Sequence, residues 1–137
     1  MLKTIREWYI SRLIKKLGHP SDRVGGKAEQ RLVWLGRDAI REVQPLANHP
    51  NPQVRYRAVW ILGKSRDPDF FETIVSKVGD PDHRVAYDAI LALGELRDPR
   101  AIPHLQALPE RHQDHPDGLE SAALMALAKL GITRETE

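Results

Sequence analysis

The segment Trp60–Asp69 reads WILGKSRDPD, and 31 positions later Leu91–Arg100 reads LALGELRDPR. Both copies place a glycine after an apolar run, and an Asp-Pro pair after a short polar stretch. Self-similarity at a fixed period of about 20–50 residues is typical of chains built from stacked repeats. The recurrence of Gly63 and Asp67-Pro68 at Gly94 and Asp98-Pro99 therefore predicts a repeated structural unit.

The repeat extends in both directions along the chain. From Val54 onward, the second copy aligns without gaps to the third copy, which begins at Val85. Arg31–Gly36 is a version shortened by one residue, and Leu119–Leu130 is a later version. The unit thus occurs about three and a half times, and its outer copies are degraded, as terminal repeats that cap a stack usually are.

Each unit is predicted to form two helices. In the second copy an apolar stripe at helical spacing is formed by Val54, Ala58, Ile61 and Leu62. Gly63 then either ends this helix or marks a close contact between helices. Asp67 can accept from free N–H groups at the start of the next helix, where Pro68 needs no partner. Helices are predicted over residues 2–17, 23–35, 38–47, 52–63, 69–78, 83–95, 100–108 and 118–130.

The fold class follows from this pattern. Apolar residues do not alternate at period two and no Asn-Gly or Asp-Gly hairpin turn joins two strand-like runs, so we predict no strand. We expect an all-α fold, an α-α superhelix (a right-handed solenoid) of about four helical hairpins whose terminal members are degenerate. Residues 1–137 should form a single domain. The polar, proline-containing link 109–118 is expected to be the most mobile segment.

Composition limits the function classes. Of the 137 residues, 41% are hydrophobic and 29% charged, and no apolar run approaches the roughly 20 residues that cross a bilayer. The chain has no cysteine, which excludes disulfide and thiol chemistry and favours a cytoplasmic location. The first 18 residues are basic and amphipathic, but they lack a continuous apolar core and contain Glu7. We therefore interpret them as a helix of the fold and not as a targeting peptide.

The segment Val85–Leu105, VAYDAILALGELRDPRAIPHL, resembles the short HEAT repeat first recognised in phycobilin lyases. The matching positions are Asp80-Pro81, Val85, Ala89, Ala92-Leu93-Gly94, Asp98-Pro99, Ala101-Ile102-Pro103 and Leu105. The resemblance covers roughly residues 24–130 and implies a solenoid of stacked helical hairpins. Proteins with such repeats include bilin lyase subunits, deoxyhypusine hydroxylases, DNA glycosylases and adaptors, so the resemblance alone does not assign a chemistry.

Catalytic and metal-binding patterns are weak. Deoxyhypusine hydroxylases carry His-Glu pairs that bind iron, whereas none of the six histidines here precedes a glutamate. His112, His115 and Asp117 are interpreted as solvated turn residues and not as metal ligands. No serine has the Gly-x-Ser-x-Gly context of a nucleophile, and Gly25-Gly26 is interpreted as a bend and not as an anion site. We expect no cofactor and no metal. Enzymatic activity is left uncertain, and we lean against it.

Charge is distributed unevenly along the chain. Residues 1–50 contain ten Lys and Arg against five Asp and Glu, and residues 51–137 contain eleven against fourteen. Candidate members of a basic patch are Arg12, Lys15, Lys16, Arg23, Lys27 and Arg31. Such a surface could contact phosphates, although a solvated basic face is the interpretation we favour. Trp34 and Trp60 occupy matching Val-Trp positions, and we expect both to pack in the core or between repeats.

The second helices of the hairpins are expected to line the concave side, where partners of such solenoids dock. Candidate partner-binding residues there are Arg41, Glu42, Gln44, Glu72, Thr73, Ser76, Lys77 and His104. The favoured function is a non-catalytic scaffold that binds another protein through its concave helix face or its end caps. The alternatives are nucleic-acid binding through the basic N-terminal third, and a phycobilin lyase-like subunit or chaperone. A homodimer through a terminal helix is left open.

Overall fold

The computed structural model describes residues 4–108 and 118–133, and within these ranges the only regular structure is helical. The helices are α1 (Ile5–Lys16), α2 (Asp22–Leu35), α3 (Arg37–Val43), η1 (Gln44–Asn48), α4 (Pro52–Lys64), η2 (Pro68–Phe70), α5 (Phe71–Val75), α6 (His83–Leu96), α7 (Ala101–Gln106) and α9 (Leu119–Lys129). Every predicted helix has a counterpart, so the all-α prediction is confirmed. The predicted mobile link lies outside the described residues, apart from Gly118.

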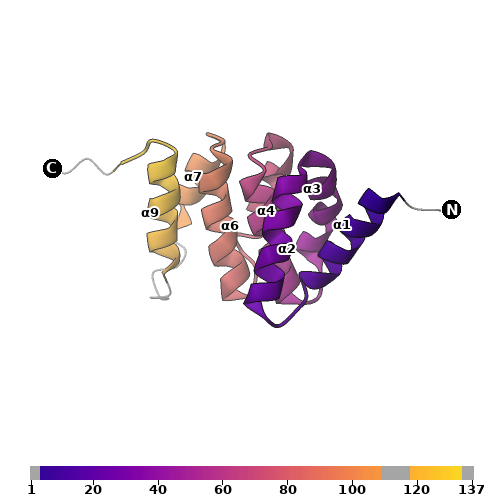
Figure 1. Ribbon diagram of the computed structural model, residues 1–137. Helices are drawn as coiled ribbons and strands as arrows, with labels where there is room; N and C mark the ends of the chain where they lie inside the picture. Colours follow the sequence, from indigo (N-terminus) through magenta and orange to yellow (C-terminus); the bar gives the residue numbers. More distant parts are fainter. Residues whose placement is uncertain (1–3, 109–117, 134–137) are drawn as a thin grey trace.

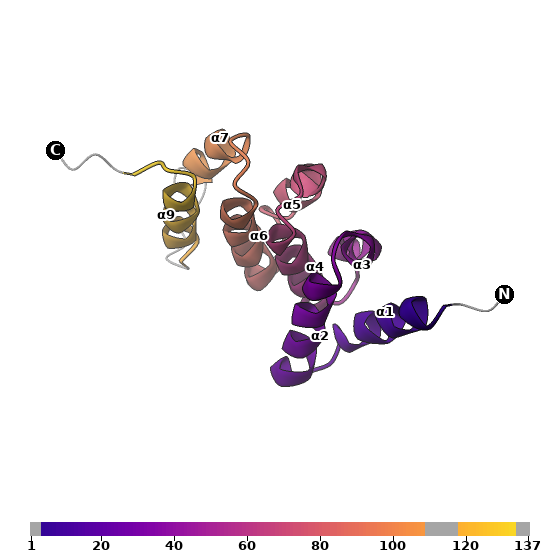
Figure 2. The ribbon, with the colours of Figure 1, turned by 45° about the horizontal axis from the view of Figure 1, so that its top comes forward.

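The helices stack side by side from α1 at one end of the molecule to α9 at the other (Figure 1). Two rows run along this stack (Figure 2). We call α2, α4, α6 and α9 the first-helix row, in which each helix packs against the next. The opposite side, formed by α3, α5 and α7, is the second-helix row. The fold is therefore a helical solenoid built from neighbour-to-neighbour contacts.

Side-chain caps explain why the helices begin where they do. Asn51 immediately precedes Pro52, the first residue of α4, and its side chain accepts from the backbone N–H of Gln53 at 3.0 Å. Asp67 accepts from the N–H of Asp69 at 2.9 Å in the same way at η2. These bonds satisfy N–H groups that have no partner within the helix. The predicted capping role of Asp67 is confirmed.

Gly63 and Gly94 mark close helix contacts. Gly63 lies inside α4, and a Cβ placed there would stand 2.7 Å from the Cβ of Ala92 in α6. A Cβ on Gly94 would stand 2.8 Å from the Cα of Ala126 in α9. Of the two interpretations of Gly63, helix contact is thus the one the structure supports. The left-handed backbone that commonly ends a helix is adopted instead by Arg66 and Arg97, at φ 54° and 56°.

The prediction of a bend at Gly25-Gly26 is wrong, because both glycines lie within α2. Gly25 faces the guanidinium group of Arg57 in α4, and a Cβ there would approach the guanidinium carbon to 2.0 Å. The absence of a side chain at this position lets a large cation lie against the backbone of α2. A Cβ added to Gly26 would instead meet no heavy atom within 4 Å, so no close contact requires glycine there.

Trp34 does not pack in the core, which corrects the sequence prediction. Its side chain is 79% exposed, whereas Trp60 is half-buried and packs against the core. The buried stripe of α2 includes Leu32, and two residues further the helix has turned by about 200°. Trp34 therefore points away from the core.

Candidate functional site

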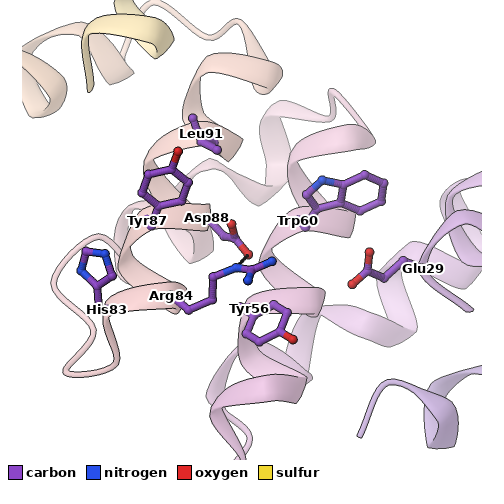
Figure 3. Close-up of a pocket in the computed structure, with 8 residues that line it drawn as sticks. All are labelled: Glu29, Tyr56, Trp60, His83, Arg84, Tyr87, Asp88 and Leu91. Atoms are coloured by element: carbon purple, nitrogen blue, oxygen red, sulfur yellow. Dashed lines mark hydrogen bonds and ion pairs between the residues drawn. The ribbon is translucent and has the colours of Figure 1, made fainter. Parts of the chain in front are cut away.

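A hollow of about 470 Å³ opens on the first-helix row (Figure 3). Its lining residues are Glu29, Tyr56, Trp60, His83, Arg84, Tyr87, Asp88 and Leu91. Glu29 comes from α2, the next two from α4, and the remainder from α6. Three neighbouring helices of the row thus contribute to one recess.

Helical spacing brings these side chains to one face. Tyr56 and Trp60 are four residues apart in α4, as are Tyr87 and Leu91 in α6, so each pair projects from the same side of its helix. Tyr56 and Tyr87 occupy the same position in successive repeats. This recurrence of tyrosine is the sequence signal that could have identified the recess, which the sequence-based selection of sites missed.

A fixed charge pair lies in the middle of the hollow. The Nε of Arg84 is 3.2 Å from Oδ2 of Asp88, and its guanidinium carbon lies 4.5 Å from the ring centroid of Tyr56. Burial raises the pKa of Asp88, and the attraction of Arg84 offsets this only in part. Since the side chain of Arg84 is 60% exposed and that of Asp88 is 9% exposed, the cation is the group offered to solvent.

Glu29 forms the wall of the hollow on the α2 side. Its Oε1 is 3.4 Å from Nε of the buried Arg57, which lies behind it. Burial raises the pKa of Glu29 to about 7, because the loss of water outweighs the attraction of Arg57. The carboxyl group is thus partly protonated near neutral pH.

A second hollow, of about 140 Å³, lies further along the same row. It is lined by Trp60, Lys64, Leu91, Ala92, Glu95, Met125, Ala126 and Lys129, from α4, α6 and α9. Trp60 and Leu91 line both hollows. The two recesses therefore adjoin, and together they form what we call the groove. Met125, 54% exposed, adds an apolar side chain at its far end.

Lys64 and Lys129 flank the second hollow and both pair with Glu95. The Nζ of Lys64 is 3.3 Å from Oε2 of Glu95, and Lys129 contacts the other carboxylate oxygen. Both lysines are more exposed than the carboxylate they share. As at Arg84, the cations point outward and the anion lies beneath them.

The residues predicted to bind a partner lie elsewhere. They come from α3, η1, α5, the turn that directly follows α5, and α7, and none of them lines the groove. Gln44 donates to the Thr73 hydroxyl at 3.0 Å, and Lys77 contacts the side-chain oxygen of Asn48, so part of this set holds neighbouring hairpins together. His104 packs edge-on against Phe71. Their proposed role in partner binding remains a prediction.

The residues predicted to form a basic patch are all exposed on α1 and α2, at the N-terminal end of the stack.

His112, His115 and Asp117 lie outside the described residues. Within the ranges 4–108 and 118–133, no group of three or more His, Asp or Glu side chains is arranged to hold a metal ion. In the same ranges, no helix has the length and hydropathy needed to span a membrane.

Comparison with known proteins identifies the repeat. The family model described as HEAT repeats matches residues 40–128. No curated protein matches the chain. Human deoxyhypusine hydroxylase in complex with glycerol is a similar solved structure, with a TM-score of 0.67 and 18% sequence identity. The similarity covers 93% of this chain and 45% of that chain, so this chain spans less than half of its length. At this identity the likeness shows the fold alone.

Proposed function

The chain belongs to the family of HEAT-repeat proteins, and on that premise we propose that it is a non-catalytic scaffold that binds an extended segment of another protein in the groove. Solenoids of this kind use long surfaces built from equivalent positions of successive repeats. Here, the groove is formed by equivalent positions of α4 and α6, together with α2 and α9. The absence of cysteine favours action in the cytoplasm.

The observation that carries this proposal is that the two hollows adjoin and share Trp60 and Leu91 as lining residues. Adjoining recesses across several helices suit an extended segment, whereas a small molecule usually occupies one enclosed cavity. Half-buried aromatic side chains such as Trp60, Tyr56 and Tyr87 offer contact area at little entropic cost, as they do at the centres of many protein interfaces.

The exposed charges of the groove indicate the chemistry of the partner. Arg84, Lys64 and Lys129 present their cationic groups, whereas the carboxylates that they pair with are largely buried. A segment with apolar side chains and one or more carboxylates would complement this arrangement. We propose such an acidic and apolar segment as the ligand.

Capture from nuclease-treated native lysate tests the proposal, with the wild type and two Trp→Ala variants as bait. Trp60→Ala removes an aromatic surface of the groove, and Trp34→Ala removes an exposed tryptophan outside it. We expect Trp60→Ala to lose the partner and Trp34→Ala to retain it. Circular dichroism and thermal melting establish that both variants are folded.

A third bait separates the two faces of the solenoid. Glu72→Arg changes an exposed residue of α5, among those predicted from the sequence to bind a partner. Loss of the partner with Glu72→Arg, together with its retention by Trp60→Ala, would contradict groove binding and support the second-helix row. Phycobilin attachment stays an untested alternative. An absorbance shift on mixing the chain with bilin and a phycobiliprotein would support it.

A further inference from the structure

Two stripes of exposed cations run along α1 and α2, each with an exposed tryptophan. On α2, Arg23, Lys27, Arg31 and Trp34 are spaced by three or four residues, and all four are exposed. On α1, the corresponding exposed set is Trp8, Arg12, Lys15 and Lys16. Side chains at this spacing share one face of a helix. We call these two sets the tryptophan stripes.

Acidic residues of the hairpin are kept off these stripes. Asp22 and Glu29 both pair with Arg57, on the side of α2 that faces α4. Glu7 is used in the capping box that begins α1, where it accepts from the N–H of Thr4. Within the described residues, none of the six stripe cations forms an ion pair. Arg12 instead places its guanidinium carbon 5.0 Å from the ring centroid of Trp8.

The tryptophans lie toward the same end of the hairpin. Trp8 is in the first turns of α1 and Trp34 is next to the last residue of α2. The guanidinium of Arg6 donates to the carbonyl of Leu35 at 3.0 Å, which ties these two helix ends together. Trp8 is 55% exposed, although burial of so large a ring would be favourable. Both rings are therefore available to a ligand.

We propose that the tryptophan stripes bind single-stranded nucleic acid. Phosphates would pair with the cations of each stripe, and unpaired bases would stack on the indole rings, a combination typical of proteins that bind single strands. Double-stranded nucleic acid fits less well, since its bases are already stacked. The surface is independent of the groove, which lies on the side of α2 marked by Glu29.

A membrane surface is the competing ligand for a basic face with tryptophans. A helix that lies in a membrane interface buries a broad apolar face among the lipids. On α1 and α2, both described over their full length, the exposed large apolar side chains are only Ile5, Trp8 and Trp34, whereas the leucines of these helices are buried or half-buried. The apolar area is too small and too divided for insertion, so the observations favour nucleic acid.

The test is fluorescence anisotropy with labelled oligothymidylate and oligouridylate of about 20 nucleotides, which distinguishes DNA from RNA. Binding to at least one of the two is expected. The slope of log K against log salt concentration should be about −0.7 for each phosphate contacted, and thus up to about −4 for six cations. Trp34→Ala should weaken binding on the order of tenfold. Lys27→Gln with Arg31→Gln should weaken binding and lower the salt slope by about 1.4.

A matched control removes two charges elsewhere. Arg66→Gln with Arg97→Gln changes two exposed arginines outside the stripes, both of which have the same backbone conformation. This variant should bind like the wild type. Binding to phosphatidylserine vesicles without binding to oligonucleotides would overturn the proposal. An equal loss of oligonucleotide affinity in the control and stripe variants would also overturn it. The same holds if a duplex binds as tightly as a single strand and Trp34→Ala does not weaken that binding.

Discussion

Arg57 is the side chain that connects the N-terminal hairpin to the rest of the stack. It is 1% exposed and donates to the carbonyls of Leu17 and His19 at 2.7 and 2.9 Å, in the link between α1 and α2. It also pairs with Asp22 and Glu29. Four interactions therefore converge on one buried cation, for which Gly25 leaves room.

Arg57→Met tests this role. The change leaves two carbonyls without their donor and Glu29 without its countercharge, so we expect a loss of about 3–5 kcal/mol in the free energy of unfolding. Urea denaturation measures the loss. Asp22→Asn is the control, since the Asp22 side chain is 85% exposed and its pair should contribute less than about 1 kcal/mol. Equal losses in the two variants would contradict the role given to Arg57.

Titration of the Glu29 carboxyl group makes the free energy of unfolding depend on pH. Its folded pKa of about 7 lies above the ordinary value of 4.5, so between these values the folded state binds more protons than the unfolded state. Stability therefore falls as pH rises through this window. Asp88, whose pKa is also raised by burial, acts in the same direction.

Glu29→Gln should remove most of this loss of stability with rising pH. We expect the wild type to lose on the order of 1–2 kcal/mol more than Glu29→Gln between about pH 5 and pH 7.5, a figure discounted for the partial exposure of the carboxylate. The measurement is urea denaturation of both proteins across this pH range. Parallel curves for the two proteins would mean that the carboxyl group of Glu29 titrates normally.

At the scale of the element, glycine sets the distance between helices. Gly63→Ala would force a methyl group against Ala92, including its Cα at 2.8 Å, and a packed backbone cannot yield easily. We expect a loss of about 1–3 kcal/mol. Gly26→Ala is the matched control in α2, because a Cβ there meets nothing within 4 Å and alanine favours helix. This variant should gain about 0.5–1 kcal/mol. Thermal denaturation compares the two.

The helices were predictable because their signals are local. Asn51-Pro52 and Asp67-Pro68 specify helix starts through bonds that span two residues, and the apolar stripes specify which face is buried. The groove was not predictable in the same way, since it depends on which faces of different helices are left uncovered. Trp34 shows the difference. Its local Val-Trp context matches that of Trp60, yet Trp34 is 79% exposed whereas Trp60 is half-buried.

At the scale of the whole molecule, each helix pair depends mainly on its neighbours, as expected for a solenoid. α9 packs on α6 and α7, whereas α1 packs on α2 at the opposite end. α4 and α6 have neighbours on both sides within the first-helix row. We therefore expect the ends of the stack to open more readily than its middle.

Gly94→Ala tests this nearest-neighbour coupling, because a Cβ at Gly94 would stand 2.8 Å from the Cα of Ala126 and push α9 away from α6. Hydrogen exchange read by mass spectrometry should become faster in α9, on the order of tenfold, since overpacking of this kind costs about 1–3 kcal/mol. Exchange in α1 and α2 should not change, because neither helix touches the altered contact. Equal acceleration along the whole chain would instead show that the stack opens as one cooperative unit. By contrast, Gly63→Ala alters the contact between α4 and α6. Because those two helices join the halves of the stack, this variant should speed hydrogen exchange in both halves.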